Sequence, residues 1–436
     1  MSIDPRAVIA ERPMGRAQIF VVALCIALNA LDGFDVLSIS FAAPGIAEEW
    51  EIDRATLGIV LSMELIGMAL GSVLLGNVAD RIGRRPTILG CLLIMASGMF
   101  LAAMADSVTT LSATRLYTGL GIGGMIATTA AVVAEFSNEK RRDLNAMLNI
   151  AGYSAGAILG GVVASVLLAQ TGDWRTVFLF GGVVTALLFP LTYFVMPESI
   201  ESLIARRPKN ALALINRTLQ RLKLTPIADL PAPATQTEKP SFTALFSMKL
   251  APTTLLLTLA YFAAILSFYY IQKWTPKIVV DMGYEASAAG GVLVCASIGG
   301  LLGAVLLGLA VQRFPLRPII IASLLAAFGA ITAFGLGADD LTQLSLIVGV
   351  AGFCINGGVV GMYPIMARAF PAAVRASGTG FAIGIGRGGS AVGPVLAGYL
   401  FAGGGGLLLV SGIMGAGALL AAFALTLLPR SPKTRA

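Results

Sequence analysis

The sequence contains no histidine, and only 12% of its 436 residues are charged. Without histidine there is no Ser-His-Asp triad, no HExxH zinc site and no histidine proton relay. Any side chain that carries a proton through the protein must therefore be a carboxylate. The four cysteines lie in apolar stretches without paired spacing, which argues against a disulfide framework. We therefore expect no metal, no cofactor and no enzymatic activity.

The sequence is rich in long apolar runs. Hydrophobic residues make up 57% of the chain and the mean hydropathy is +0.86, more apolar surface than a soluble domain can bury. Runs of about twenty residues, each able to cross a hydrocarbon core of about 30 Å as a helix, recur along the chain. We predict an all-α membrane protein with twelve transmembrane helices, at approximately 18–43, 55–79, 86–105, 108–134, 144–169, 175–196, 251–275, 286–311, 317–337, 341–367, 375–400 and 405–428.

Basic residues are concentrated in alternate loops. Lys and Arg resist translocation, so the loops that carry them are expected on the cytoplasmic side. The first predicted outer loop is instead acidic, with Glu48, Glu49 and Asp53. Both termini are thus predicted to be cytoplasmic, and the net charge of +7 reflects topology rather than nucleic-acid binding. The inner loops carry Arg81, Arg84, Arg85, Lys140, Arg141, Arg142, Arg313, Arg317, Arg368 and Arg375.

One long polar stretch, 198–250, divides the chain. It contains four prolines and an amphipathic segment, 209–222, that is helical at best. We predict a linker between two bundles. The predicted parts are a cytoplasmic N-terminus (1–17), an N-terminal six-helix bundle (18–197), a cytoplasmic linker (198–250), a C-terminal six-helix bundle (251–428) and a cytoplasmic tail (429–436).

The two predicted bundles repeat each other. A shift of 232 residues pairs Pro44 with Pro276, Gly67 with Gly299, Gly71 with Gly303, Arg81 with Arg313 and Arg85 with Arg317. A shift of 233 pairs Arg142 with Arg375 and Gly156 with Gly389. Two pseudo-symmetric six-helix repeats are typical of secondary transporters, whose substrate site lies between the repeats near the bilayer midplane.

Three further motifs carry a family resemblance that covers nearly the whole chain. The segment GNVADRIGRRP, Gly76 to Pro86, resembles the signature loop of the major facilitator superfamily, and the match to that superfamily extends through RLYTGLGIGG from Arg115 in the fourth predicted helix to the PES from Pro197 at the end of the sixth. LDGFD from Leu31, followed by FAAP from Phe41, resembles the aromatic acid:proton symporter family. The resemblance implies the twelve-helix fold of that superfamily and proton-coupled import of a small aromatic carboxylate.

Charged residues at bilayer depth are few, and each is costly unless it is paired or hydrated. The repeat offers a control, because none of them has a charged counterpart in the other half. They therefore do not belong to the shared scaffold, and we consider them candidates for function. They are Asp32, Asp35, Glu64, Arg115 and Arg387, with Lys273 near the outer end of its helix.

The acidic candidates are predicted to couple transport to protons. Asp32 and Asp35 are three residues apart and share a helix face, where two ionised carboxylates would repel each other. At least one is expected to take up a proton readily. Glu64 departs from the family pattern, which usually has a small or neutral residue at this position. It is either a further proton site, a ligand for a ring hydroxyl or amine, or a helix-packing contact.

The basic candidates are predicted to bind the substrate anion. Arg115 lies at a depth similar to that of Asp32, and Arg387 lies near the midplane in a glycine-rich stretch. A guanidinium there can bind a carboxylate through two hydrogen bonds. The structural alternative for each arginine is an ion pair with Asp32 or Asp35. Aromatic side chains that could stack on a benzoate-like ring include Phe34, Tyr269 and Tyr270.

The signature loop is predicted to close the inner gate. The resemblance implies this latch role for Asp80 and Arg84, and Glu135 with Arg142 at the inner end of the fourth helix is expected to join it. The full set of predicted gating residues is Gly76, Asp80, Arg81, Gly83, Arg84, Arg85, Glu135 and Arg142.

The sequence therefore predicts a proton-coupled importer of a small, hydroxybenzoate-like aromatic carboxylate in a bacterial cytoplasmic membrane. Its partners are the substrate, protons and the lipid bilayer, with no nucleic acid, and it is expected to be a monomer. Two alternatives remain open: a proton symporter of a non-aromatic organic anion, such as a sugar acid or dicarboxylate, and a membrane sensor that binds its ligand without accumulating it.

Overall fold

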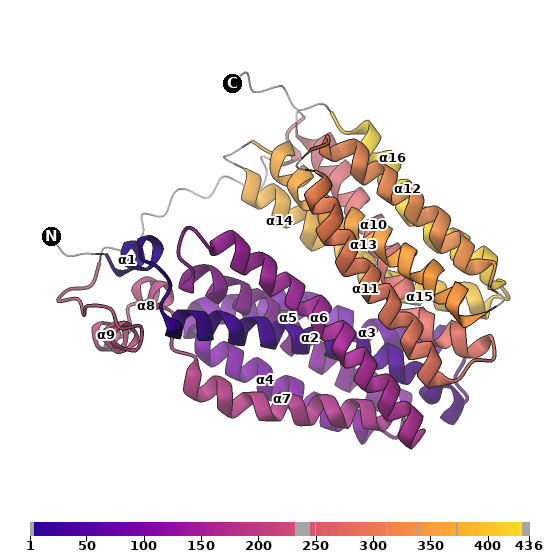
Figure 1. Cartoon of the computed structure of the whole chain (residues 1–436), viewed down its shortest axis with the longest axis horizontal. Coiled ribbons are helices and arrows are strands. Elements are labelled where there is room, and N and C mark those ends of the chain that lie inside the picture. The colour runs from indigo at the N-terminus through magenta and orange to yellow at the C-terminus, as the bar shows by residue number, and fades with distance from the viewer. Residues whose placement is uncertain are drawn as a thin grey trace. The chain divides into compact units, whose positions relative to one another are not determined.

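The computed structural model describes residues 4–231, 245–248, 250–311, 313–338, 340–371 and 374–429. Within these residues the chain is helical and contains no strand, which confirms the all-α prediction (Figure 1). Parts of the predicted N-terminus, linker and tail, namely 1–3, 232–244, 249 and 430–436, lie outside the described residues.

The first predicted bundle contains long helices preceded by one short one. They are α1 (Pro5–Glu11), α2 (Arg16–Glu49), α3 (Arg54–Ile82), α4 (Arg84–Ala103), α5 (Val108–Phe136), α6 (Arg142–Thr171) and α7 (Arg175–Val195). The linker contributes α8 (Ile200–Arg206) and α9 (Ala211–Arg221). The predicted amphipathic segment is therefore a helix, and it buries Ile215 and Leu219 on one face.

The second predicted bundle holds α10 (Ala251–Asp281), α11 (Ala286–Ala310), α12 (Leu316–Gly335), α13 (Leu341–Ala369), α14 (Arg375–Gly386), α15 (Gly388–Ala402) and α16 (Leu407–Leu427). Among the described residues, eleven helices are long and apolar enough to cross a membrane. The remaining predicted span, 375–400, was expected to be one continuous helix, and this detail is wrong. The span consists of α14 and α15, with Arg387 alone between them.

The glycines around Arg387 explain this break. Gly384, Gly386, Gly388 and Gly389 surround it, and glycine is a poor helix former because its backbone loses more freedom on folding. At the junction, the Ser390 amide donates to the Arg387 carbonyl at 2.9 Å, a tighter i to i+3 turn. The interruption is slight, because Arg387 keeps helical backbone angles (φ −60°, ψ −18°) and its amide donates to the Ile383 carbonyl at 2.9 Å.

The chain forms two compact units whose boundary falls inside helices. The first unit contains the chain up to Val36, Ile66–Gly160, and Arg175 onward into the linker. The second contains Leu37–Leu65, Gly161–Trp174 and the chain from the linker onward. Helices α2, α3 and α6 thus contribute residues to both units. The division into bundles at 18–197 and 251–428 stays a prediction based on the repeat.

Helix packing repeats between the two halves of the sequence. In the first unit, a side chain at Gly67 or Gly71 of α3 would collide with the Leu116 or Leu120 carbonyl of α5. In the second unit, the equivalent Gly299 and Gly303 of α11 approach main-chain carbonyls of α13 in the same way. Close backbone approach of this kind is what small residues permit in membrane helices.

Candidate functional site

The acid pair of the first unit lies where α2 crosses α6. A side chain at Gly33, between Asp32 and Asp35, would collide with the Tyr153 carbonyl, and a side chain at Gly156 would collide with the Ala30 carbonyl. The two backbones are therefore in contact at this crossing. Asp32 and Asp35 are both fully buried. The tight crossing fixes the depth and direction of both acids.

The Asp32 carboxylate has no hydrogen-bond partner among the described residues. An ionised carboxylate at bilayer depth costs several kcal/mol when nothing compensates its charge. The Asp35 carboxylate faces α7, where a side chain at Gly181 would come within 3.2 Å of Oδ1. Burial of this kind suits a group that takes up and releases a proton rather than one that remains a permanent anion.

Arg115 on α5 is fully buried beside the acid pair. It donates from Nη2 to the Asp35 main-chain carbonyl at 2.9 Å and from Nη1 to the Met99 sulfur at 3.1 Å. Its guanidinium carbon lies 5.2 Å from the Phe178 ring centroid, a cation–π distance. Helices α2, α4 and α7 therefore enclose this arginine, and it holds the main chain that carries Asp35.

Phe34 lies on α2 among the same helices. It is 4% exposed, packs against Gly160 of α6 and makes an edge contact with Phe180 of α7 at 5.5 Å between ring centroids. In the first unit the structure thus brings together Asp32, Asp35 and Arg115, while Phe34 packs between helices.

The second unit holds a cluster of one arginine and three tyrosines. Arg387, at the break between α14 and α15, lies close enough to Tyr261, Tyr269 and Tyr363 to interact with them electrostatically. The Tyr261 and Tyr363 hydroxyls are hydrogen-bonded to each other at 3.0 Å. Gly386 permits this arrangement, because a side chain there would collide with the Tyr261 ring. A guanidinium beside phenolic hydroxyls can bind a carboxylate and a hydroxyl group together.

The sequence identified this cluster only in part. Arg387 and Tyr269 were predicted site residues, but Tyr261 was missed, because nothing in its sequence context distinguishes it from a packing aromatic. Tyr270, also predicted, is fully buried, and its hydroxyl is hydrogen-bonded to Ser411 of α16 at 2.7 Å. It lies outside the set of residues that surround Arg387.

Glu64 and Lys273 form a buried ion pair in the second unit. Glu64 Oε2 of α3 lies 3.4 Å from Lys273 Nζ of α10, and both side chains are 0% exposed. Removing one partner of such a pair leaves an uncompensated buried charge. The pair joins helices from the two sequence repeats.

The contacts of α3 change partner at this ion pair. Before it, Arg54 forms an ion pair with Asp281 of α10 at 3.0 Å, and a side chain at Gly58 would come within 2.6 Å of the Pro394 carbonyl of α15. After it, Gly67 approaches α5. The Glu64–Lys273 ion pair therefore marks the end of the seam along which α3 packs on helices of the other repeat.

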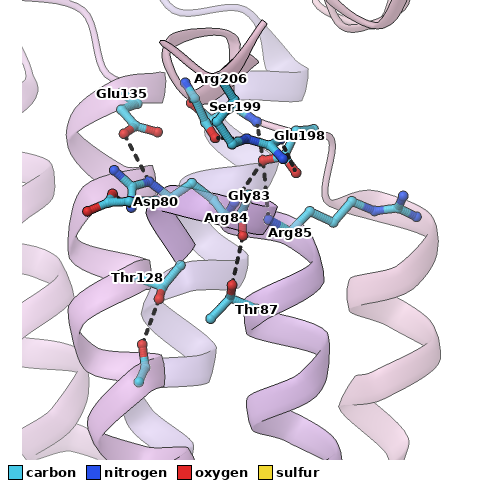
Figure 2. A network of polar contacts seen from close by, with 12 residues as sticks. Asp80, Gly83, Arg84, Arg85, Thr87, Thr128, Glu135, Glu198, Ser199 and Arg206 are labelled. Atoms are coloured by element: carbon cyan, nitrogen blue, oxygen red, sulfur yellow. Dashed lines mark hydrogen bonds and ion pairs between the residues drawn. The ribbon is translucent and has the colours of Figure 1, made fainter. Parts of the chain in front are cut away.

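The signature loop forms a polar network in the first unit (Figure 2). Arg84 bonds Asp80 at 2.7 Å and Glu135 at 3.3 Å. Gly83 adopts a φ of 114°, a conformation that other residues rarely adopt, and thereby turns the chain sharply between α3 and α4. The structure thus brings four of the predicted gating residues into one network, namely Asp80, Gly83, Arg84 and Glu135.

Glu198 also belongs to this network, although it was not among the predicted gating residues. Its carboxylate accepts hydrogen bonds from the Arg84 amide at 2.9 Å and the Ser199 amide at 3.0 Å, and it lies 3.6 Å from Arg206 (Figure 2). The signal was present, because Glu198 is the central residue of the PES motif. It ties the start of α4 to the linker helix α8.

Three predicted gating residues lie outside the network. Arg81 and Arg142 are exposed and form no ion pair among the described residues, and the space next to Gly76 is open. Arg85 joins the network through its amide, which donates to Glu198 at 3.3 Å, while its guanidinium donates to the Tyr193 carbonyl of α7 at 2.6 Å and lies over the Tyr193 ring at 5.0 Å. Arg85 therefore binds the end of α7.

Comparison with known proteins identifies the family of this chain. The family model of the Major Facilitator Superfamily matches residues 23–348 and 257–436. The chain is 32% identical to a 4-hydroxybenzoate transporter of Pseudomonas putida over 90% of its length and 88% of that protein. It is also 32% identical to a gallate transporter of Pseudomonas putida, covering 97% of this chain and 94% of that one.

Among solved structures, a D-xylose–proton symporter is similar with a TM-score of 0.70 at 18% identity, over 96% of this chain and 99% of that one. This likeness concerns the fold alone. The family match and the relatives are all transporters, so the expectation that the chain is not an enzyme is confirmed. The chain is a multi-pass membrane protein of the Major Facilitator Superfamily, and it belongs to the aromatic acid:proton symporter family within it.

Proposed function

We propose that this protein imports a small aromatic carboxylate, of the hydroxybenzoate type, together with protons. The observation that carries the proposal is the Arg387 cluster, where the guanidinium contacts Tyr261 and lies within electrostatic reach of Tyr269 and Tyr363. The arginine binds the carboxylate, and the tyrosines contact the ring and its hydroxyl groups. The substrates named for the relatives, 4-hydroxybenzoate and gallate, support the same chemistry.

The depth of Arg387 in the sequence supports this role, because the substrate sites of such transporters lie near the bilayer midplane. Arg115 is the second arginine predicted to bind substrate. Its hydrogen bonds to Asp35 and Met99 favour a role in fixing the acid pair, with Arg387 as the first contact of the carboxylate.

Asp32 and Asp35 are the proposed proton carriers. Both are fully buried, and Asp32 has no hydrogen-bond partner among the described residues, so neutralisation by a proton stabilises the site. Proton uptake and substrate binding then favour the same change of conformation, and this coupling drives alternating access.

Glu64 has a different proposed part in coupling. Its ion pair with Lys273 holds α3 against α10. Opening this seam requires the pair to separate, and protonation of Glu64 lowers the cost of separation because it removes one of the two charges. The proposal thus retains Glu64 as a proton-linked group, one that acts on closure rather than on the substrate.

The proposed location is a bacterial cytoplasmic membrane, with both termini and the signature loop on the cytoplasmic side. The distribution of basic loop residues supports this orientation. We propose that the protein acts as a monomer. The Arg84 network, with Asp80, Glu135 and Glu198, is then the inner latch.

Uptake into proteoliposomes tests the function. Purified protein is reconstituted, and accumulation of labelled 4-hydroxybenzoate is followed with and without an inward proton gradient. We expect accumulation only with the gradient, collapse on addition of a protonophore, and competition by unlabelled benzoate and gallate. Stronger competition by an aliphatic sugar acid or dicarboxylate would indicate that the substrate is a non-aromatic organic anion. Binding without any accumulation would instead indicate a sensor.

A further inference from the structure

A groove lies on the second unit between the start of α12 and the end of α16. It has a volume of about 560 Å³ and is lined by Arg317, Ile321 and Leu325 of α12 and by Thr426 and Leu428 near the end of α16. Both helices are membrane spans. Leu325 is 46% exposed, so the groove opens toward the surrounding lipid rather than into the bundle.

Arg317 supplies the charge at one end of this groove. Its Nη2 donates to the Thr426 carbonyl at 2.7 Å. Among the described residues, no carboxylate forms an ion pair with it. A guanidinium carries five N–H donors in a planar fork that matches phosphate oxygens. Arg317 is therefore fixed at the groove with donors to spare.

The sequence repeat provides an internal comparison for this site. Arg85 corresponds to Arg317 at a shift of 232 residues, and it bonds the main-chain carbonyl of Tyr193 in the same manner. Tyr193 corresponds to Thr426 at a shift of 233. In the first unit the Tyr193 ring covers the guanidinium at 5.0 Å. The second unit has Thr426 there, whose short side chain cannot cover a guanidinium as a ring does.

We propose that this groove binds an anionic phospholipid, with its phosphate on Arg317 and an acyl chain along Ile321 and Leu325. The lining is complementary to such a lipid, because it has a cation at one end for the phosphate and aliphatic side chains along its length for the acyl chain. Arg317 also lies in a predicted inner loop, the side on which anionic lipids attract basic residues. The cytoplasmic leaflet supplies this lipid, and the neutral head group of phosphatidylcholine is a poorer match.

Native mass spectrometry of the purified full-length protein tests the site. The protein is titrated with phosphatidylglycerol and, in parallel, with phosphatidylcholine of the same chain length. For Arg317→Gln we expect about five-fold weaker binding of phosphatidylglycerol, the effect of one basic residue at a lipid surface. Thr426→Tyr should weaken binding similarly with the arginine intact, because the new ring covers the guanidinium as Tyr193 does in the first unit.

Arg85→Gln is the matched control, since it removes the same charge from the equivalent position, where the Tyr193 ring covers the guanidinium. It should leave phosphatidylglycerol binding unchanged. Equal binding by wild type, Arg317→Gln and Thr426→Tyr would overturn the proposal, as would equal binding of the two lipids by the wild type. Thr426 is exposed, so its substitution is not expected to disturb folding. The result is independent of substrate transport, because no step of the assay requires it.

Discussion

The two units place opposite chemistry on their functional helices. In the first unit, two carboxylates are buried at a tight helix crossing and a neighbouring arginine is bound to main chain. In the second, an arginine at a helix break lies beside three tyrosines. The first arrangement suits a small, fixed charge such as a proton, and the second suits a polar aromatic ligand. On the proposed function, proton handling by Asp32 and Asp35 and substrate recognition by Arg387 would therefore reside on different repeats.

The strongest test of this comparison is removal of the acids. An inward gradient of two pH units can drive about hundred-fold accumulation if one proton is coupled, because each unit is worth about 1.4 kcal/mol. We expect Asp32→Asn and Asp35→Asn each to abolish accumulation, so that the substrate concentration inside the vesicles is about equal to that outside, because the coupling is lost. Uptake is measured in proteoliposomes.

Exchange of labelled for unlabelled substrate across the same vesicles, without a gradient, is the control for the acid variants. It requires folding and substrate binding but not net proton movement. Both variants should retain exchange. Full gradient-driven accumulation by either one would exclude that acid from the proton pathway.

Substitution of Arg387 tests the other side of the comparison. Arg387→Gln should raise KM for a carboxylate substrate about ten- to hundred-fold, because a charge-assisted hydrogen bond contributes about 1.5–3 kcal/mol. Arg387→Lys should lie in between, since lysine keeps the charge but not the planar fork. Initial rates give KM. Arg375→Gln, at the exposed start of α14, removes the same charge outside the cluster and should leave KM unchanged.

The Glu64–Lys273 ion pair tests whether the two repeats also share a structural joint. Either single change, Glu64→Gln or Lys273→Gln, leaves a buried partner uncompensated and should destabilise the protein by about 3–5 kcal/mol. The double change removes both charges and should cost clearly less than the sum of the two. Chemical or thermal unfolding of purified protein measures all three. Additive losses would show that the two side chains do not depend on each other.

The smallest expected effect concerns the tyrosine hydroxyls. Tyr261→Phe and Tyr363→Phe should each weaken uptake of 4-hydroxybenzoate about two- to ten-fold, the worth of one neutral hydrogen bond, with little change for benzoate. Competition assays with the two acids measure the ratio. Tyr270→Phe is the matched control, because its hydroxyl is bound to Ser411 and should not affect this ratio.

Most of the fold could be predicted from the sequence. Apolar runs identify the spans, because polar groups are costly in lipid, and the 232-residue repeat relates the spans of the two halves to each other. The break at Arg387 could not be predicted in this way. A glycine-rich stretch gives the same hydropathy signal whether the helix is continuous or interrupted, and it is also typical of close helix packing. The sequence therefore does not distinguish the two cases.

The candidate site could be predicted in part. Charge at bilayer depth identified Asp32, Asp35, Arg115 and Arg387, because charge is rare there. It could not reveal that Glu64 pairs with Lys273, because their separation of 209 residues is bridged only by tertiary packing. Tyr261 was missed for a similar reason, since an aromatic residue in an apolar run has no distinguishing sequence signal.

The crossing of α2 and α6 has a consequence for how this protein can evolve. Gly33 and Gly156 each lie against a main-chain carbonyl of the other helix, so neither position accepts even a methyl group without displacing backbone. Drift at these two codons is therefore restricted, and the acids beside Gly33 keep their orientation as the rest of the chain diverges. The hydroxyl groups of the tyrosine cluster face side chains, with Tyr261 hydrogen-bonded to Tyr363, rather than main chain. On the proposed function, single substitutions of these tyrosines can change substrate preference without disturbing the crossing that orients the acids.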